Sequence, residues 1–169
     1  MNGAVIYSSK TGNTKKVAEA ILKGCPNNFK IFSVDEDPEL SEFDFIFMGY
    51  WVDKGTADKK ALEFMEDICH KKVALFATLG AYPDSDHAKE SLAAGAKCLG
   101  EGCTVVDNFI CQGAIDPKLM EWMNKLPEDH PHAPDEARIK RWKDASTRPN
   151  QEDFNNAEKF AEKVISKLA

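Results

Sequence analysis

Apolar runs alternate with amphipathic helical patterns along almost the whole chain. Runs typical of strands occupy residues 3–8, 29–34, 43–49, 73–77 and 104–111. Because strands that alternate with helices form parallel units with right-handed crossovers, the pattern predicts an α/β fold: a three-layer, doubly wound, five-stranded parallel sheet in the order 2-1-3-4-5. The expected helices cover 14–23, 58–69, a segment that begins after Asp84 or Ser85, 117–125 and 152–168.

The length of 169 residues predicts a single domain, 1–169, with an insertion at about 126–151 before the last helix. Four prolines interrupt the insertion, and its basic segment at 135–143 predicts one short helix. An insertion of this length is often functional. A surface brace, in which Ile139 and Trp142 pack on the body of the protein, explains the pattern equally well.

Composition disfavours several classes of protein. The net charge of −6 disfavours binding to nucleic acid or to an anionic membrane. No stretch of 18 apolar residues occurs and the N-terminus runs directly into a strand, so we expect neither a transmembrane helix nor a signal peptide. Five scattered cysteines without a C-x-x-C pair favour a reducing, cytoplasmic location over disulfides or a zinc site. The cluster His130-Pro131-His132 is interpreted as a surface loop and not as a metal site.

A turn rich in hydroxyl groups, Ser8–Thr14, joins the first predicted strand to the first predicted helix. The N-terminus of a helix attracts anions through its unpaired N–H groups and its partial positive charge. Ser and Thr hydroxyls add donors, and Gly12 lets the backbone approach a ligand closely. The turn matches neither the Walker A loop nor the dinucleotide fingerprint, because it has only one Gly. It predicts a site for a phosphorylated ligand, although an ordinary strand-to-helix turn explains these residues in isolation equally well.

Two further loops follow strands that end at the same edge of the predicted sheet, Gly49–Gly55 and Ala77–Asp84. Ligands of doubly wound sheets bind outside the carboxyl ends of the strands. Each loop carries aromatic residues, and Trp51 and Tyr82 suit a flat ring system that is held by stacking on both faces. The alternative is that both aromatic side chains anchor their loops on the core.

In order along the chain, Ser9-x-Thr11-Gly12-x-Thr14, Trp51 and Tyr82-Pro83-Asp84 resemble the flavodoxin family, over about residues 3–125 and the last helix. The resemblance implies a flavodoxin-like fold and bound FMN, with the phosphate on residues 9–14 and the isoalloxazine ring between Trp51 and Tyr82. Two positions depart from the family pattern: Gly49-Tyr50 replaces a frequent Pro/Ser-Thr pair, and Val52 replaces a frequent Gly or Asn. The candidate cofactor-binding residues are Ser9, Lys10, Thr11, Gly12, Asn13, Thr14, Tyr50, Trp51, Val52, Gly55, Thr78, Leu79, Gly80, Tyr82 and Asp84.

If FMN is bound, the cofactor supplies the redox chemistry. No side chain in the three loops has the character of an obligate catalytic acid or base, so we expect a monomeric electron carrier that serves a redox partner protein. The alternative is an FMN-dependent NAD(P)H reductase that acts on quinones or similar acceptors. A receiver-type signalling domain is disfavoured, because Ser8-Ser9 occupy the place of its Mg²⁺-binding acidic pair. Several acidic residues either steer a basic partner or form a solvated face: Asp35, Glu36, Asp37, Glu39, Glu42, Asp53 and Asp58.

Overall fold

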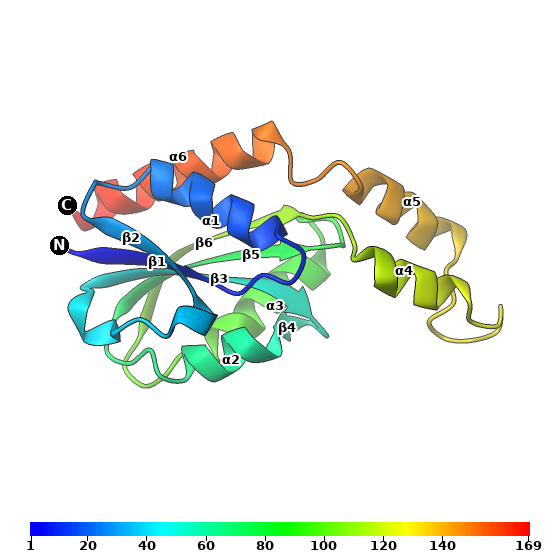
Figure 1. Cartoon of the computed structure of the whole chain (residues 1–169), viewed down its shortest axis with the longest axis horizontal. Coiled ribbons are helices and arrows are strands. Elements are labelled where there is room, and N and C mark those ends of the chain that lie inside the picture. Colours follow the sequence, from blue (N-terminus) through cyan, green and yellow to red (C-terminus); the bar gives the residue numbers. More distant parts are fainter.

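The structure is a computed structural model that describes residues 1–169 as a parallel sheet with helices on both faces (Figure 1). The five long strands lie in the order β2-β1-β3-β5-β6, which confirms the predicted arrangement. They pair in parallel throughout, and β2 lies at one edge of the sheet. Their bounds are β1 (Gly3–Tyr7), β2 (Phe29–Ser33), β3 (Phe45–Asp53), β5 (Lys72–Leu79) and β6 (Thr104–Gln112).

The helices form the two outer layers of the fold. Helices α1 (Asn13–Lys23) and α6 (Gln151–Leu168) cover one face of the sheet, and α2 (Lys59–Met65) and α3 (Asp86–Ala96) cover the other. Along β1, Ile6 packs in the core on the α2 side, while its neighbour Val5 packs in the core on the α1 side. Both faces of the central strands are therefore buried, which explains their near-continuous apolar sequences. None of the helices combines the length and the apolarity needed to cross a membrane.

The segment after Gly49 differs from the sequence-based expectation of a loop. Strand β3 continues to Asp53 and turns back into a short antiparallel strand, β4 (Thr56–Ala57). The two turn residues, Lys54 and Gly55, have φ angles of 50° and 79°, the left-handed conformation of a two-residue hairpin turn. The prediction missed the hairpin because its signal lies in the Lys-Gly pair and not in the apolar run before it.

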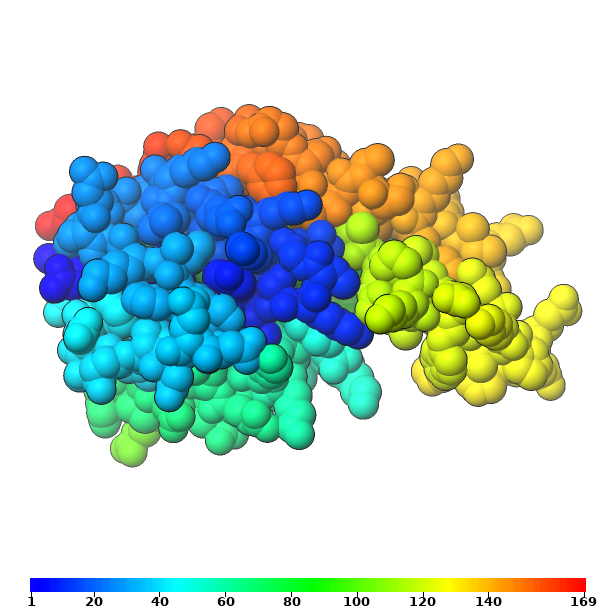
Figure 2. Space-filling model, in the orientation of Figure 1, coloured from blue at the N-terminus to red at the C-terminus, as the bar shows by residue number.

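Helices α4 (Pro117–Asn124) and α5 (Glu136–Ala145) project beyond the sheet (Figures 1 and 2). We call residues 116–147 the arm. Helix α4 confirms the predicted helix at 117–125, and α5 is the short helix expected inside the insertion. Ile139, which the brace interpretation placed against the body, is 52% exposed, whereas Trp142 is half-buried. The arm therefore packs only in part on the rest of the protein.

Candidate functional site

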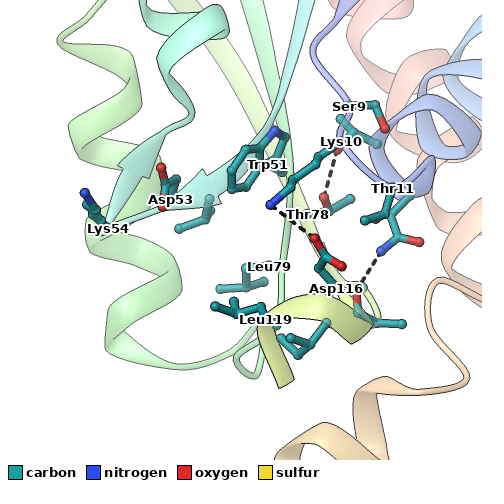
Figure 3. A pocket seen from close by; sticks show the side chains of 17 residues that line it. Ser9, Lys10, Thr11, Trp51, Asp53, Lys54, Thr78, Leu79, Asp116 and Leu119 are labelled. Carbon is teal, nitrogen blue, oxygen red and sulfur yellow. Dashed lines mark hydrogen bonds and ion pairs between the residues drawn. The ribbon is translucent and has the colours of Figure 1, made fainter. Parts of the chain in front are cut away.

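A cavity of about 280 Å³ opens at the edge of the sheet where β1, β3 and β5 end (Figure 3). Four segments line it: the loop between β1 and α1, the β3–β4 hairpin, the end of β5, and the loop between β6 and α4. In doubly wound sheets ligands bind at this edge, where the strand order reverses. The cavity therefore lies where the sequence placed the candidate site.

The loop before α1 leaves the first N–H groups of the helix available. Gly12 is the N-cap residue, with a φ of 97°, and no side chain caps the helix, whereas each of the other α-helices has a side-chain cap. No heavy atom lies within 4 Å of the place where a Cβ on Gly12 would stand. The first turn has no acidic residue, and the Gly12 N–H donates to Ser9 Oγ at 3.1 Å. This end of α1 can thus receive an anion.

A pair of buried threonines joins two walls of the cavity. The hydroxyl oxygens of Thr14, in α1, and Thr78, in β5, lie 2.9 Å apart and form a hydrogen bond. The two side chains are 1% and 3% exposed, respectively. Either hydroxyl can be the donor in this bond, and the backbone N–H of Thr14, in the first turn of α1, is a further donor for an anion.

Lys10 extends across the mouth of the cavity. Its Nζ lies 5.6 Å from the centre of the Trp51 ring and 3.1 Å from a carboxylate oxygen of Asp116 (Figure 3). The N–H of Lys118 and the ammonium of Lys10 both donate to Asp116 and hold the pKa of its carboxyl below the usual range. A second contact, from Asn13 Nδ2 to the backbone oxygen of Ala114 at 3.0 Å, holds the loop between β6 and α4 against the start of α1.

Most of the predicted cofactor-binding residues come together at the cavity. Gly12 shapes the turn beneath it without lining it, while Gly55 lies in the hairpin turn and Asp84 in the loop before α3. The predicted residues that line the cavity are Ser9, Lys10, Thr11, Asn13, Thr14, Trp51, Val52, Thr78, Leu79 and Gly80.

The two tyrosines among the predicted residues lie elsewhere. Tyr50 is fully buried in the core on the α2 and α3 side, because β3 continues past Gly49 and the alternation of the strand turns this side chain inward. We therefore correct Tyr50 from a cofactor contact to a core residue. The Tyr82 hydroxyl donates to Asp144 of the arm at 2.7 Å, and its ring does not line the cavity. Of the predicted aromatic pair, only Trp51 lines the cavity in this structure.

The fourth wall of the cavity, the loop between β6 and α4, contains no residue that was predicted from the sequence. The signal was its position after a strand that ends at the same edge as the other three loops. Here Ile115 packs so closely on Gly80 that a Cβ on this glycine would collide with the isoleucine side chain. The lining residues that were not predicted are Asp53, Lys54, Gly113, Ala114, Ile115, Asp116 and Leu119.

The buried side chain of Asp58 caps α2 and joins it to the residue that follows β1. Its Oδ1 accepts hydrogen bonds from Ser8 Oγ at 2.7 Å and from the Ala61 N–H at 3.2 Å, and its Oδ2 is buried without a partner. Burial raises the pKa of the Asp58 carboxyl, and the hydrogen bonds oppose this shift only in part. Because Asp58 is 2% exposed, it does not belong to the acidic surface that was expected to include it.

The cavity has a polar end and an apolar end. The polar end consists of the Ser9 and Thr11 side chains and the N-terminus of α1, and the apolar end contains Trp51, Leu79 and Ile115. FMN carries a phosphate at one end and a flat ring system at the other. The donors at the α1 N-terminus suit the phosphate, and the aromatic and aliphatic side chains suit the ring.

Comparison with known proteins agrees with this geometry. A family model described as a flavodoxin domain matches residues 4–162. The flavodoxin-like domain-containing protein BilS of Clostridioides difficile (strain CD3) is 31% identical over 176 aligned residues, which cover 100% of this chain and 99% of that protein. The BilS protein of Clostridium symbiosum (strain WAL-14163) is 26% identical over 148 residues, 78% of each chain.

Solved structures show the same fold at low sequence identity. Flavodoxin 2 from Bacillus cereus superposes with a TM-score of 0.60 at 16% identity, and 99% of each chain is covered. A flavodoxin from the domain Archaea gives a TM-score of 0.55 at 16% identity, again over 99% of each chain. The family model, the more similar relative and the fold lead to one conclusion. The chain belongs to the flavodoxin family, whose cofactor is FMN.

Proposed function

We propose that this protein binds FMN in the cavity and carries electrons to a redox partner protein. The observation that supports this proposal most directly is the α1 N-terminus, which has no side-chain cap and no acidic residue and faces a cavity with an aromatic wall. The hydroxyls of Ser9 and Thr11 and the first N–H groups of α1 would hold the phosphate. Trp51 and its aliphatic neighbours would pack on the ring and exclude water from it.

FMN, when bound, supplies the redox chemistry, and the chain binds and orients it. A flavoprotein from Lactobacillus acidophilus NCFM, solved in complex with FMN, superposes with a TM-score of 0.50 at 19% identity, over 64% of this chain and 92% of that one. At this identity the similarity shows the fold alone. The assignment of FMN to this chain therefore rests on its family and on the donors at its own cavity.

The side chains around the cavity favour a carrier over a self-sufficient reductase. The titratable residues among them are Lys10, Asp53, Lys54 and Asp116, and two of these four form an ion pair with each other. No His, Cys or Tyr lines the cavity to shuttle a proton at neutral pH. We further propose a monomer in the cytoplasm, where the five free cysteines would stay reduced.

The phosphate site is tested by comparing FMN with riboflavin, which lacks the phosphate. We expect Ser9→Ala/Thr11→Ala to weaken FMN binding about tenfold or more, because hydrogen bonds to a charged group are strong, and to change riboflavin binding little. Isothermal titration calorimetry of the apoprotein measures both affinities. Ser41→Ala, an exposed serine far from the cavity in the sequence, is the matched control. Equal losses for the two ligands would place the phosphate elsewhere.

The carrier role is tested by steady-state turnover. The FMN-loaded protein is mixed with NADH or NADPH and a soluble quinone, and oxidation of the nicotinamide is followed by absorbance. We expect turnover far below ordinary enzyme rates, together with rapid oxidation of the chemically reduced protein by a one-electron acceptor protein. Turnover at about 1–1000 s⁻¹, the usual range of enzymes, would instead identify an NAD(P)H-dependent reductase.

A further inference from the structure

A groove of about 490 Å³ lies beside the cofactor cavity, between the loop before α1 and helix α4. Figure 2 shows α4 and the loop that follows it standing out from the body, next to the N-terminal loop. Lys10, Thr11, Asp116 and Leu119 line both the groove and the cofactor cavity. Because the two hollows share these walls, a partner that fills the groove also reaches the edge of the cofactor site. Lys118 and Trp122 line the groove but not the cavity.

The groove exposes large apolar side chains. Leu119 is 42% exposed and Trp122 is 51% exposed, and they lie three residues apart on α4, so they share one face of the helix. Of the four exposed large hydrophobic residues in the chain, three lie in the arm. An exposed tryptophan beside a hollow is typical of the centre of a protein interface.

The charge of the groove is opposite to that of the whole protein. Its charged residues are Lys10, Lys118 and Asp116, and the carboxylate of Asp116 is already engaged by Lys10. The arm as a whole is close to neutral, with six Lys or Arg residues and seven Asp or Glu residues, so the positive charge is a property of the groove. By contrast, the segment at 35–44 holds six acidic residues and no Lys or Arg, in a chain with a net charge of −6. An acidic partner is therefore attracted to the groove and repelled by the segment at 35–44.

We propose that this groove is the docking surface for an electron-transfer protein whose contact face is acidic around an apolar side chain. The apolar side chain packs between Leu119 and Trp122, and the surrounding carboxylates pair with Lys118. Docking here brings the partner against the wall that the groove shares with the cofactor cavity. The proposal rests on the proposed function as an FMN-dependent electron carrier.

The test uses two small haem proteins of opposite charge as electron acceptors: acidic soluble cytochrome b5 and basic cytochrome c. The FMN-loaded protein is reduced anaerobically and mixed with each acceptor in a stopped-flow instrument. We expect the second-order rate constant with cytochrome b5 to fall as NaCl rises from about 20 to about 200 mM, because salt screens an attraction. The rate constant with cytochrome c also falls with salt, because the net charge of −6 attracts a basic protein, but Lys118→Glu should not lower it.

Substitutions in the groove and outside it test whether the partner docks at the groove. Trp122→Ala and Lys118→Glu should each lower the rate constant with cytochrome b5 about tenfold, the effect of losing a central interface residue. Ile139→Ala removes an equally exposed apolar side chain outside the groove, and Lys30→Glu reverses an exposed charge on β2; neither should change the rate by more than about twofold. Equal effects of groove and control variants, or a cytochrome b5 rate without salt dependence, would overturn the docking surface.

Two further measurements separate this inference from its alternatives. FMN affinity is measured first for every variant, and a protein that binds no FMN would contradict the proposed function and, with it, this inference. Sedimentation velocity of the FMN-loaded protein tests for a second copy of the chain in the groove. A dimer that Trp122→Ala dissociates would replace the electron-transfer partner as the occupant.

Discussion

Thr14 and Thr78 are bonded to each other through their hydroxyls, inside the wall of the cofactor cavity. The bond links the first turn of α1 to the end of β5, two elements that are far apart in the sequence. A contact between two buried polar groups therefore helps to fix the position of the predicted phosphate loop relative to β5.

Removing one hydroxyl of this pair should lower the free energy of unfolding more than removing both. Thr78→Val or Thr14→Val leaves one buried hydroxyl unpaired, which should lower the free energy of unfolding by about 1–3 kcal/mol. The double variant leaves no hydroxyl unpaired, so it should be less destabilised than either single variant. Urea unfolding measures all three, with Thr104→Val, at an exposed position, as the control. Strict additivity would show that the two hydroxyls do not interact.

Trp51 should account for most of the change in tryptophan fluorescence when FMN binds. The chain has three tryptophans, and Trp51 is the one that lines the cavity. We expect FMN to quench the emission strongly in the unmodified protein and in Trp142→Phe, and only weakly in Trp51→Phe. Trp51→Ala should also weaken FMN binding about tenfold, because it removes an aromatic wall. Unchanged affinity in Trp51→Ala would place the flavin ring elsewhere.

Tyr82 should position the arm and contribute little to cofactor binding. Its hydroxyl donates to Asp144, which also accepts a hydrogen bond from Lys140 at 2.8 Å. We expect Tyr82→Phe to speed amide hydrogen exchange in α5, because it removes one of the few polar contacts that hold the arm. FMN affinity should change by less than about twofold, since Tyr82 does not line the cavity. A large loss of affinity in Tyr82→Phe would indicate that its hydroxyl binds the cofactor directly.

The buried carboxyl of Asp58 should make stability depend on pH. Its folded-state pKa is raised above the ordinary value of about 3.9, so its contribution to stability is complete below about pH 4 and is lost as the pH rises through the folded-state pKa. Asp58→Asn keeps an acceptor for Ser8 and Ala61 without a charge to bury. We therefore expect Asp58→Asn to gain stability relative to the unmodified protein as the pH rises from about 4 to about 7.

Urea unfolding across this pH range measures the difference. Asp58→Ala is the companion variant, because it removes the α2 cap as well as the charge. It should lower the free energy of unfolding by about 1 kcal/mol through loss of the cap. A difference between Asp58→Asn and the unmodified protein that stays constant with pH would show that this carboxyl does not titrate in the range.

The sequence was sufficient for the order of the sheet and for the edge at which the cavity opens. Strand periodicity and right-handed connections fix which strands neighbour one another, and ligands of such sheets bind where the strand order reverses. The loop Ser8–Thr14 could be read from the sequence because the residues that shape a phosphate-binding turn are adjacent in the chain. The start of α1 directly after Gly12 depends only on the local backbone of the same segment.

Tertiary structure decided which side chains point into the cavity. Tyr50 and Trp51 are adjacent aromatic residues, and only the continuation of β3 turns one into the core and the other toward the cavity. The Tyr82 side chain points toward Asp144, which is 62 positions away in the sequence. Asp144 lies in α5, and the alternation of strands and helices does not predict where α5 lies relative to the sheet. The period of the apolar residues predicts which face of a helix or strand is buried. Contacts between segments that are distant in the sequence depend instead on the packing of the whole chain. The sequence alone therefore determined the sheet and the turn Ser8–Thr14, and the folded chain determined the other walls of the cavity and the groove beside it.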